Sequence, residues 1–206
     1  MNGKYTLAEE TKTVSGHTLH RLKALKDFAY ARAGRLGGWI ETEKNLSGPG
    51  DAWVTAEARV FGDAQVFGDA LVFGDATVSG NACVSGNARV GDRVWIFEAA
   101  WVTGDALVSG KARVSGHARI KDGAWVGDHA WIAGKVRVSG CARVRDHTRL
   151  VNNECVSGHT MIAHPPPPNT EPVYARLKMF SREKVKNLTQ IAVETATVTA
   201  RGGGKC

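Results

Sequence analysis

Aliphatic residues recur at every sixth position over more than half of the chain. They occupy all nineteen such positions from Val54 to Ile162, without an insertion or a slip. A small residue, usually Ala, precedes each of them by two positions, and Gly followed by Asp or Asn commonly precedes that pair. The repeating unit therefore reads G-[DN]-A-x-V-x.

This unit predicts a strand followed by a turn. Side chains alternate between the two sides of a strand, so Ala and Val share the inner side and the residue between them points outward. Gly with Asp or Asn tolerates the positive φ of a tight turn. Three strands and three turns make one coil of eighteen residues, and coils stack at a spacing of ~4.8 Å. The repeat predicts an all-β fold, a parallel β-helix of about six to seven coils.

The six-residue pattern over residues 52–163 resembles the hexapeptide-repeat superfamily. Its members form left-handed parallel β-helices and usually assemble as trimers, so the resemblance implies a left-handed helix and a homotrimer. The segment GRLGGWIETEKNLS at residues 34–47 is similar to the entry segment of the YdcK-like proteins of bacteria and their phages. The superfamily includes acyltransferases, γ-class carbonic anhydrases and proteins without known activity, so the fold does not imply a function.

The N-terminal end of the β-helix needs a cap, because its terminal strands would otherwise expose unpaired edges. Ile40 and Leu46 continue the six-residue step, with two extra residues before Val54. The helix is therefore expected to begin near residue 37. Residues 17–25, HTLHRLKAL, are expected to form a strand that closes this end, within a small cap over residues 1–36.

The repeat ends at Ile162, and four prolines follow at residues 165–168. Proline cannot donate ladder hydrogen bonds, so the β-helix is expected to occupy residues 37–164. The remaining segment, residues 165–206, is expected to be a proline linker with an α/β tail that serves oligomerisation or capping. Within it, residues 181–194 fit a short helix that Ser181 caps, and a last strand follows.

The net charge of +7 is divided unevenly along the repeat. Residues 51–110 carry three basic and eight acidic side chains, whereas residues 111–163 carry nine basic and four acidic ones. The two portions thus have net charges of −5 and +5, which predicts an anionic partner for the second. Nothing resembles a membrane span or a secretion signal, and the four cysteines are scattered, so a cytoplasmic protein is expected.

The histidines of the repeat raise the question of catalysis. Acyltransferases of this fold typically carry a long loop that clasps the substrate, with a catalytic His in or beside it, and no loop interrupts this repeat. A γ-class carbonic anhydrase requires a close His pair and a third His upstream, whereas His129 and His147 of this repeat lie eighteen residues apart and fall on one edge of adjacent coils. The histidines instead occupy the polar turn position: His117, His129, His147 and His159. No catalytic residue, metal or cofactor is expected.

The outward positions carry tryptophans and arginines on every side of the predicted coil. The first column contains Trp95, Arg113, Trp131 and Arg149, and the turn before it contributes Lys111, His129 and His147. The second column contains Arg119 and Arg137, and the third begins with Trp53. Three interpretations stay open: contacts between the subunits of a trimer, a site for an anionic aromatic ligand, and extended nucleic acid. The modest charge argues against nucleic acid.

These observations favour a non-enzymatic homotrimer that sequesters a small phosphorylated ligand of the nucleotide type. The nine candidate ligand-binding residues come from the first two columns and their turns: Trp95, Lys111, Arg113, Arg119, His129, Trp131, Arg137, His147 and Arg149. The resemblance to phage proteins suggests a counter-defence protein that sequesters nucleotide messengers. The alternatives are a hexapeptide-repeat acyltransferase that uses acyl-CoA and a purely structural trimer.

Overall fold

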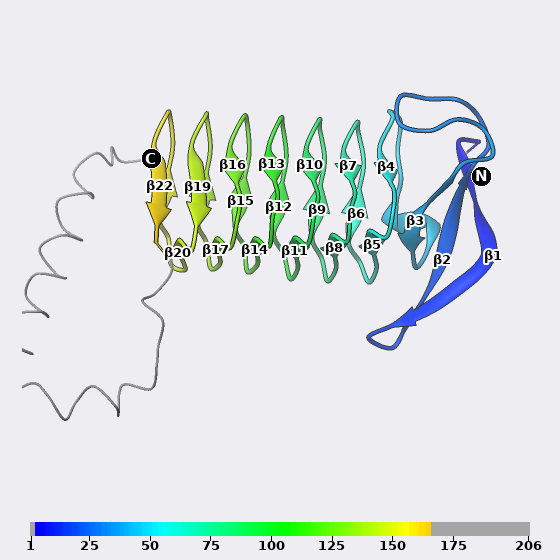
Figure 1. The fold of residues 1–206 in the computed structure, drawn as a ribbon, viewed down its shortest axis with the longest axis horizontal. Helices are drawn as coiled ribbons and strands as arrows, with labels where there is room; N and C mark the ends of the chain where they lie inside the picture. Colours follow the sequence, from blue (N-terminus) through cyan, green and yellow to red (C-terminus); the bar gives the residue numbers. More distant parts are fainter. Residues whose placement is uncertain (1–2, 166–206) are drawn as a thin grey trace, which may run out of the picture. The chain divides into compact units, whose positions relative to one another are not determined.

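The computed structural model describes residues 3–165, and these form a parallel β-solenoid of about seven turns (Figure 1). The strands of successive turns pair in parallel, and partners on the same face lie eighteen residues apart through most of the solenoid, as in Trp95 with Arg113. The predicted all-β parallel β-helix of six to seven coils is confirmed. The helix and strand expected between residues 181 and 206 lie outside the described residues.

Three sheets form the sides of the solenoid, and we call them face 1, face 2 and face 3 in chain order. Face 1 consists of β3 (Leu36–Ile40), β5 (Arg59–Val60), β8 (Thr77–Val78), β11 (Trp95–Ile96), β14 (Arg113–Val114), β17 (Trp131–Ile132) and β20 (Arg149–Leu150). Face 2 consists of β6 (Gln65–Val66), β9 (Cys83–Val84), β12 (Trp101–Val102), β15 (Arg119–Ile120), β18 (Arg137–Val138) and β21 (Cys155–Val156). Face 3 consists of β4 (Trp53–Val54), β7 (Leu71–Val72), β10 (Arg89–Val90), β13 (Leu107–Val108), β16 (Trp125–Val126), β19 (Arg143–Asp146) and β22 (Met161–His164).

The core is the bore of the solenoid. The aliphatic residue of every repeat from Val54 to Val144 is completely buried. The small residue two positions before each of them has at most 1% of its surface exposed. Val94 and Val136 take the place of Ala in this second column and are buried as well. Burial decreases at the last coil, where Leu150 keeps 8% of its surface exposed and Ile162 is half-buried.

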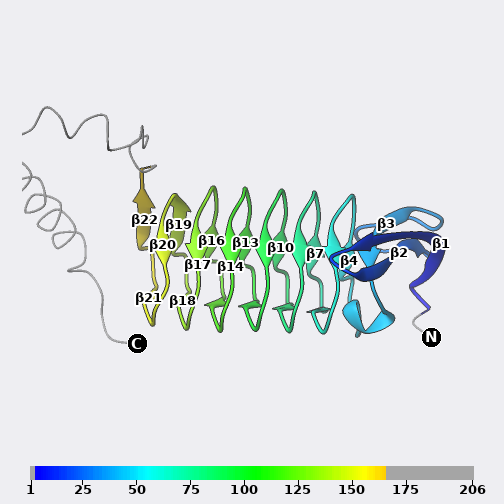
Figure 2. The ribbon, with the colours of Figure 1, turned by 90° about the horizontal axis from the view of Figure 1, so that it is seen from below.

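A β-hairpin extends face 1 beyond its first solenoid strand. It consists of β1 (Tyr5–Val14) and β2 (His17–Ala24), and β2 pairs in antiparallel fashion with β3 (Figures 1 and 2). Ser15 and Gly16 join the strands with positive φ angles, the conformation of a tight hairpin turn. The strand predicted at residues 17–25 is confirmed as β2. Its partner β1 was not predicted, because its sequence has no regular apolar alternation.

The N-terminal segment covers one aromatic residue that the sequence placed among the outward positions. Trp53 has no exposed surface, because its ring packs against Phe28 at a centroid distance of 5.0 Å and against Tyr5 at 6.3 Å. Trp53 thus occupies the predicted outward position, but the N-terminal segment covers it. The repeat period cannot reveal this burial, since the covering residues come from outside the repeat.

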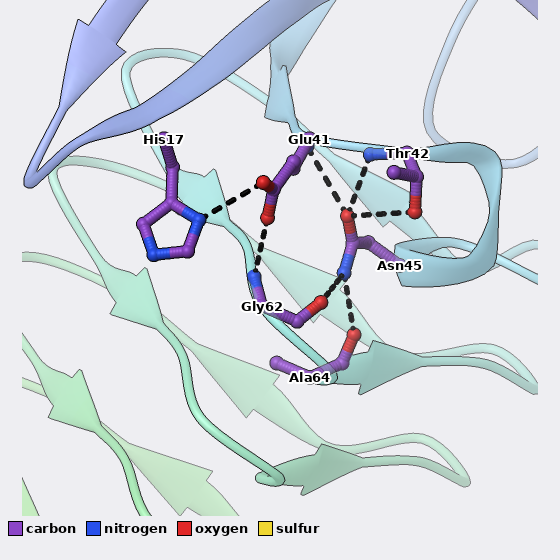
Figure 3. A network of polar contacts seen from close by, with 6 residues as sticks. All are labelled: His17, Glu41, Thr42, Asn45, Gly62 and Ala64. Carbon is purple, nitrogen blue, oxygen red and sulfur yellow. Dashed lines mark hydrogen bonds and ion pairs between the residues drawn. The ribbon is translucent and has the colours of Figure 1, made fainter.

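Asn45 is the last residue of the short 3-10 helix η1 (Glu43–Asn45), where the first coil is irregular (Figure 3). Its side chain makes hydrogen bonds to backbone groups on both sides, as a paired strand would do elsewhere in the solenoid. Its side-chain nitrogen donates to the carbonyl oxygens of Gly62 and Ala64, at 2.8 and 2.9 Å. Its side-chain oxygen accepts from the backbone N–H groups of Glu41 and Thr42, at 3.1 and 2.8 Å. This buried amide therefore links the entry segment to the first regular coil.

Candidate ligand-binding face

Tryptophans and arginines alternate up face 1 in adjacent strands. Trp95, Arg113, Trp131 and Arg149 pair in direct register. They come from β11, β14, β17 and β20, which follow one another along the solenoid (Figure 1). They occupy the outward position between the buried Ala and Val of each repeat. The exposed fractions of Trp95 and Trp131 are 53% and 38%, and both arginines are exposed.

Each arginine in this column lies over the tryptophan of the preceding coil. The Cζ atom of Arg149 is 4.4 Å from the ring centroid of Trp131, and that of Arg113 is 5.7 Å from Trp95. A cation over an indole ring is attracted by the negative face of the ring. Within residues 3–165, no carboxylate lies at ion-pair distance from either guanidinium. Their N–H groups therefore remain available to an external anion.

The corner that precedes face 1 adds further cationic and aromatic side chains. Lys111, His129 and His147 occupy equivalent positions of successive coils and are exposed. The rings of His129 and His147 stack in parallel, with centroids 4.7 Å apart and planes inclined by 4°. Arg93 occupies the same position one coil before Lys111 and was missed by the sequence analysis. Its signal was an Arg at a position that elsewhere carries Asp or Asn.

Carboxylates in the same corner are engaged with the backbone. Asp92 accepts a hydrogen bond from the N–H of Gly110 at 2.8 Å, and Asp128 accepts one from the N–H of Asp146 at 3.2 Å. The corner is therefore a mixed surface, in which these acids stabilise turns while the neighbouring cations project freely. We define the binding face as Trp95, Lys111, Arg113, His129, Trp131, His147 and Arg149.

The structure brings these seven of the nine predicted ligand-binding residues onto one face. The other two, Arg119 and Arg137, lie on face 2 as neighbours in β15 and β18. Arg119 stacks over Trp101 at 5.5 Å, and Arg143 stacks over Trp125 at 5.8 Å on face 3. The Trp–Arg pair thus recurs on all three faces, and face 1 is distinguished by carrying two such pairs in sequence.

Two hollows of the described part of the chain lie away from the binding face. A hollow of about 900 Å³ is bordered by residues 27–35 and Thr55. A second, of about 550 Å³, is bordered by Tyr30, Asn87, Arg89, Asp105 and Leu107 at face 3. A ligand of the binding face would therefore lie on a flat sheet surface and not in a pocket.

The histidines of the described residues lie in β2, in β22 and at three corners of the solenoid, where His129 and His147 form one stacked pair. Within the part of the chain that the structure describes, no three His, Cys, Asp or Glu side chains are grouped so that they could hold a metal ion. Residues 3–165 also contain no helix with the length and apolarity that a membrane crossing requires. Face 1 presents exposed indole and guanidinium groups, which are the kinds of group that can contact planar rings and anions.

The N-terminal end of face 1 holds a carboxylate in a comparable setting. Glu57 occupies the corner position equivalent to Lys111 and His129, and it pairs with Lys12 at 3.0 Å and with Arg21 at 2.9 Å. Both cations lie over the ring of Trp39, whose Nε1 donates to Glu57 at 3.1 Å. The hydrogen bond from Arg21, with those from Lys12 and Trp39, lowers the pKa of Glu57 to about 2.

The comparison with known families agrees with this architecture. The YdcK Beta solenoid repeat matches residues 64–80, a segment that contains β6, β7 and β8. No curated protein matches the chain. The match covers nearly one coil of eighteen residues, and the same unit continues through the following coils. Together with the three parallel sheets, it identifies the chain as a β-solenoid repeat protein.

Proposed function

We propose that this β-solenoid is a non-catalytic binding protein that sequesters a small phosphorylated ligand of the nucleotide type on its binding face. The observation that carries the proposal is the pair of exposed Trp–Arg stacks on face 1, whose guanidinium groups have no carboxylate partner within the described residues. Arginine binds phosphate oxygens through two parallel hydrogen bonds, and an indole ring stacks on a base.

The cluster around Glu57 supports this chemistry from within the molecule. There an indole, an Arg and a Lys hold one carboxylate at the same kind of corner. The binding face has the cations and the indoles, but its corner carboxylates Asp92 and Asp128 bond to the backbone, and within residues 3–165 none pairs with Lys111, Arg113 or Arg149. An external phosphate would take the place that Glu57 takes in the first coil.

The expected affinity follows from the number of contacts that a flat face can make. A hydrogen bond to a charged group contributes about 1.5–3 kcal/mol, and a stacked base contributes about 1–3 kcal/mol. Two arginine contacts and one stacked base support a dissociation constant on the order of micromolar, after the entropic cost of association. A ligand with two phosphates would engage both Trp–Arg stacks.

Calorimetry of the full chain against mono-, di- and cyclic nucleotides tests the proposal. Arg113→Ala and Arg149→Ala should each weaken binding at least tenfold. Arg143→Ala is the matched control, because it removes the same kind of Trp–Arg stack from face 3 and should leave binding unchanged. Recovery of the unaltered nucleotide after heat denaturation would distinguish sequestration from turnover.

Two outcomes would contradict the proposal. Binding of acyl-CoA without binding of any nucleotide would support the acyltransferase alternative. Absence of binding by the whole panel would leave a structural role. Native mass spectrometry of freshly purified protein adds a direct measurement, since it reports any ligand that co-purifies.

A further inference from the structure

No strand of the N-terminal hairpin joins the sheet of face 2, and the N-terminal segment contacts the corners beside its first strand, β6, where His17 packs against Phe61 and the hydroxyl of Tyr30 donates to the carbonyl oxygen of Asp69. The hairpin joins face 1, where Leu19 packs with Trp39 and Phe61. The loop before β3 reaches face 3, where Tyr30 borders a hollow together with Arg89 and Leu107. Face 2 contains six short parallel strands and, within the described residues, no strand of the cap.

An apolar side chain is exposed in the central coil of face 2. Trp101 in β12 has 48% of its surface exposed, and Phe67, after β6, has 37% exposed. Large aromatic side chains of this kind are enriched at the centres of protein interfaces. Trp101 also lies at the boundary between the acidic and the basic portion of the repeat.

Face 2 and its two bordering corners carry net charges of opposite sign on the two sides of the Trp101 coil. The two coils before it carry Asp63 and Asp69 and no Lys or Arg. The two coils after it carry four cations and one acid: Arg119, Lys121, Asp122, Lys135 and Arg137. The net charges are −2 and +3. Three acids are engaged internally: Glu98 by the N–H of Gly116 and Asp105 by the amide of Asn87 in the central coil, and Asp69 by the N–H of Asp51. Asp63 is therefore the acid of the preceding coils whose carboxylate stays available to the second copy.

We infer that face 2 is the interface of an antiparallel pair of identical chains, related by a two-fold axis that passes through Trp101 along the strand direction. This rotation reverses the order of the coils and keeps each corner opposite the same corner of the second copy. It places Trp101 against Trp101 of the second copy at the centre. The acidic coils then lie opposite the basic coils on both sides.

The register of the repeat makes one charge pair specific. Asp63 and Lys135 occupy the same corner, thirty-six residues before and after Ala99 in the Trp101 coil. The two-fold axis therefore brings Asp63 of each chain opposite Lys135 of the other. Both side chains are exposed, and neither has an ion-pair partner within residues 3–165. A parallel trimer would instead bring coils of equal charge to the same height.

This pairing also assigns a role to Arg137, one of the two predicted ligand-binding residues that lie away from face 1. Arg137 occupies the outward position two coils after Trp101, and Gln65 occupies that position two coils before it. The pairing places Arg137 opposite Gln65 of the second copy, between the corner residues Asp63 and Asp69. The interface uses face 2 and the proposed ligand uses face 1, so each hypothesis can fail without the other.

Sedimentation equilibrium of the full chain over roughly micromolar to 100 µM concentrations and at low salt, where charge pairs are least screened, tests the inference. The expected species is a dimer. Trp101→Ser should raise its dissociation constant more than tenfold, because the side chain lies at the two-fold axis and is removed twice. The matched control is Trp131→Ser on face 1, which removes a similarly exposed, Arg-stacked indole and should leave the dimer intact.

Charge reversal tests the orientation of the two chains. Asp63→Lys and Lys135→Glu should each weaken the dimer, and the double variant should restore it, because both swapped pairs regain opposite charges. Calorimetry with nucleotides should give the same result for these variants as for the unaltered chain. A monomer at the highest concentration, a trimer mass, a dimer that tolerates Trp101→Ser, or a double variant without rescue would each overturn the inference.

Discussion

At the residue scale, the corners of the solenoid show how a left-handed backbone conformation is tolerated without glycine. Most corners carry Gly with φ near +70°, and at Gly110 a Cβ atom would lie 2.7 Å from the backbone nitrogen of Asp128. Other corners carry a residue with a side chain at a positive φ: Ala56, Asp92, Glu98, Asp122, Asp128 and Asp146.

Four of these acidic corner residues offset the cost of the left-handed backbone conformation by a hydrogen bond to the next coil. Their carboxylates accept hydrogen bonds from the backbone N–H eighteen residues later: Asp92 from Gly110, Glu98 from Gly116, Asp122 from Gly140 and Asp128 from Asp146. The left-handed conformation costs about 1–2 kcal/mol for a residue with a Cβ atom. A hydrogen bond to a charged acceptor offsets a cost of that size.

The inner and outer sides of one strand give the most direct test of the register. Val108 is completely buried in the bore, whereas Leu107 beside it has 37% of its surface exposed. Val108→Asp would bury a carboxylate without a partner and should lower the free energy of unfolding by several kcal/mol. Leu107→Asp, the same change one residue earlier, should alter it by less than about 1 kcal/mol. Urea denaturation followed by circular dichroism measures both, and equal effects would refute the register.

At the scale of elements, the entry segment depends on Asn45. Its amide satisfies two carbonyl oxygens and two backbone N–H groups while fully buried. Asn45→Leu keeps the approximate volume and leaves these groups without their partner, at about 1–3 kcal/mol for each buried group left unsatisfied. We therefore expect a loss of several kcal/mol of unfolding free energy, measured by urea denaturation. Asn153→Leu, at an exposed position of the last coil, provides the control and should have little effect. Equal losses from the two substitutions would contradict this role of Asn45.

Glu57 links the hairpin to the first coil in a pH-dependent way. Its pKa is about 2 in the folded chain, below the usual value of 4.5. A lowered folded-state pKa contributes stability that is present above the unfolded-state value and is lost as the pH falls toward the folded-state value. Because the side chain of Glu57 is 51% exposed, the contribution should stay below about 1 kcal/mol.

Glu57→Gln should therefore destabilise the chain near neutral pH, and the difference should shrink as the pH falls below the usual value of 4.5 and vanish as the pH passes below the folded-state pKa of about 2. The measurement is the difference in unfolding free energy between the two chains at several pH values in that interval. Glu154→Gln in the last coil is the control, since no cation pairs with Glu154 within residues 3–165. A difference that does not vary with pH would show that Glu57 acts through packing alone.

The repeat predicted the solenoid strands because each strand depends on the same local pattern. Val54 to Ile162 could be placed on the inner side, and Trp95, Arg113, Trp131 and Arg149 in one column, from the eighteen-residue period alone. The same period carries no information about residues whose contacts occur only once in the structure. Lys4 donates from its buried Nζ to the carbonyl oxygens of Gly50 and Ala52, and neither this contact nor the strand β1 has a periodic signal.

At the scale of the described solenoid, stability is a sum of contacts between neighbouring coils. Each coil hydrogen-bonds to the one before and the one after it, so a terminal coil has contacts on one side. The N-terminal coil is covered by the hairpin and by the aromatic residues around Trp53. At the other end, Leu150 and Val156 retain 8% and 4% of their surface and Ile162 is half-buried. The two ends of the solenoid should therefore open with different free energies.

Native-state hydrogen exchange would measure this difference. We expect the slowest backbone amides in β9 to β16 and progressively faster exchange through β20, β21 and β22, because local opening spreads from the coil with the fewest partners. Two matched substitutions sharpen the test. Val144→Ala and Val90→Ala remove the same methyl groups from fully buried positions of face 3, each at roughly 1–3 kcal/mol.

The two substitutions should act on different coils, because each weakens contacts only with its neighbours. Val144→Ala should accelerate exchange in the coils that follow it and leave β9 to β13 protected. Val90→Ala should accelerate exchange in the central coils, because it weakens the contacts of β10 with its neighbours β7 and β13. Uniform protection from β5 to β22, with both substitutions acting equally on every amide, would mean that the solenoid unfolds as one cooperative block and that its coils are not independent nearest-neighbour units.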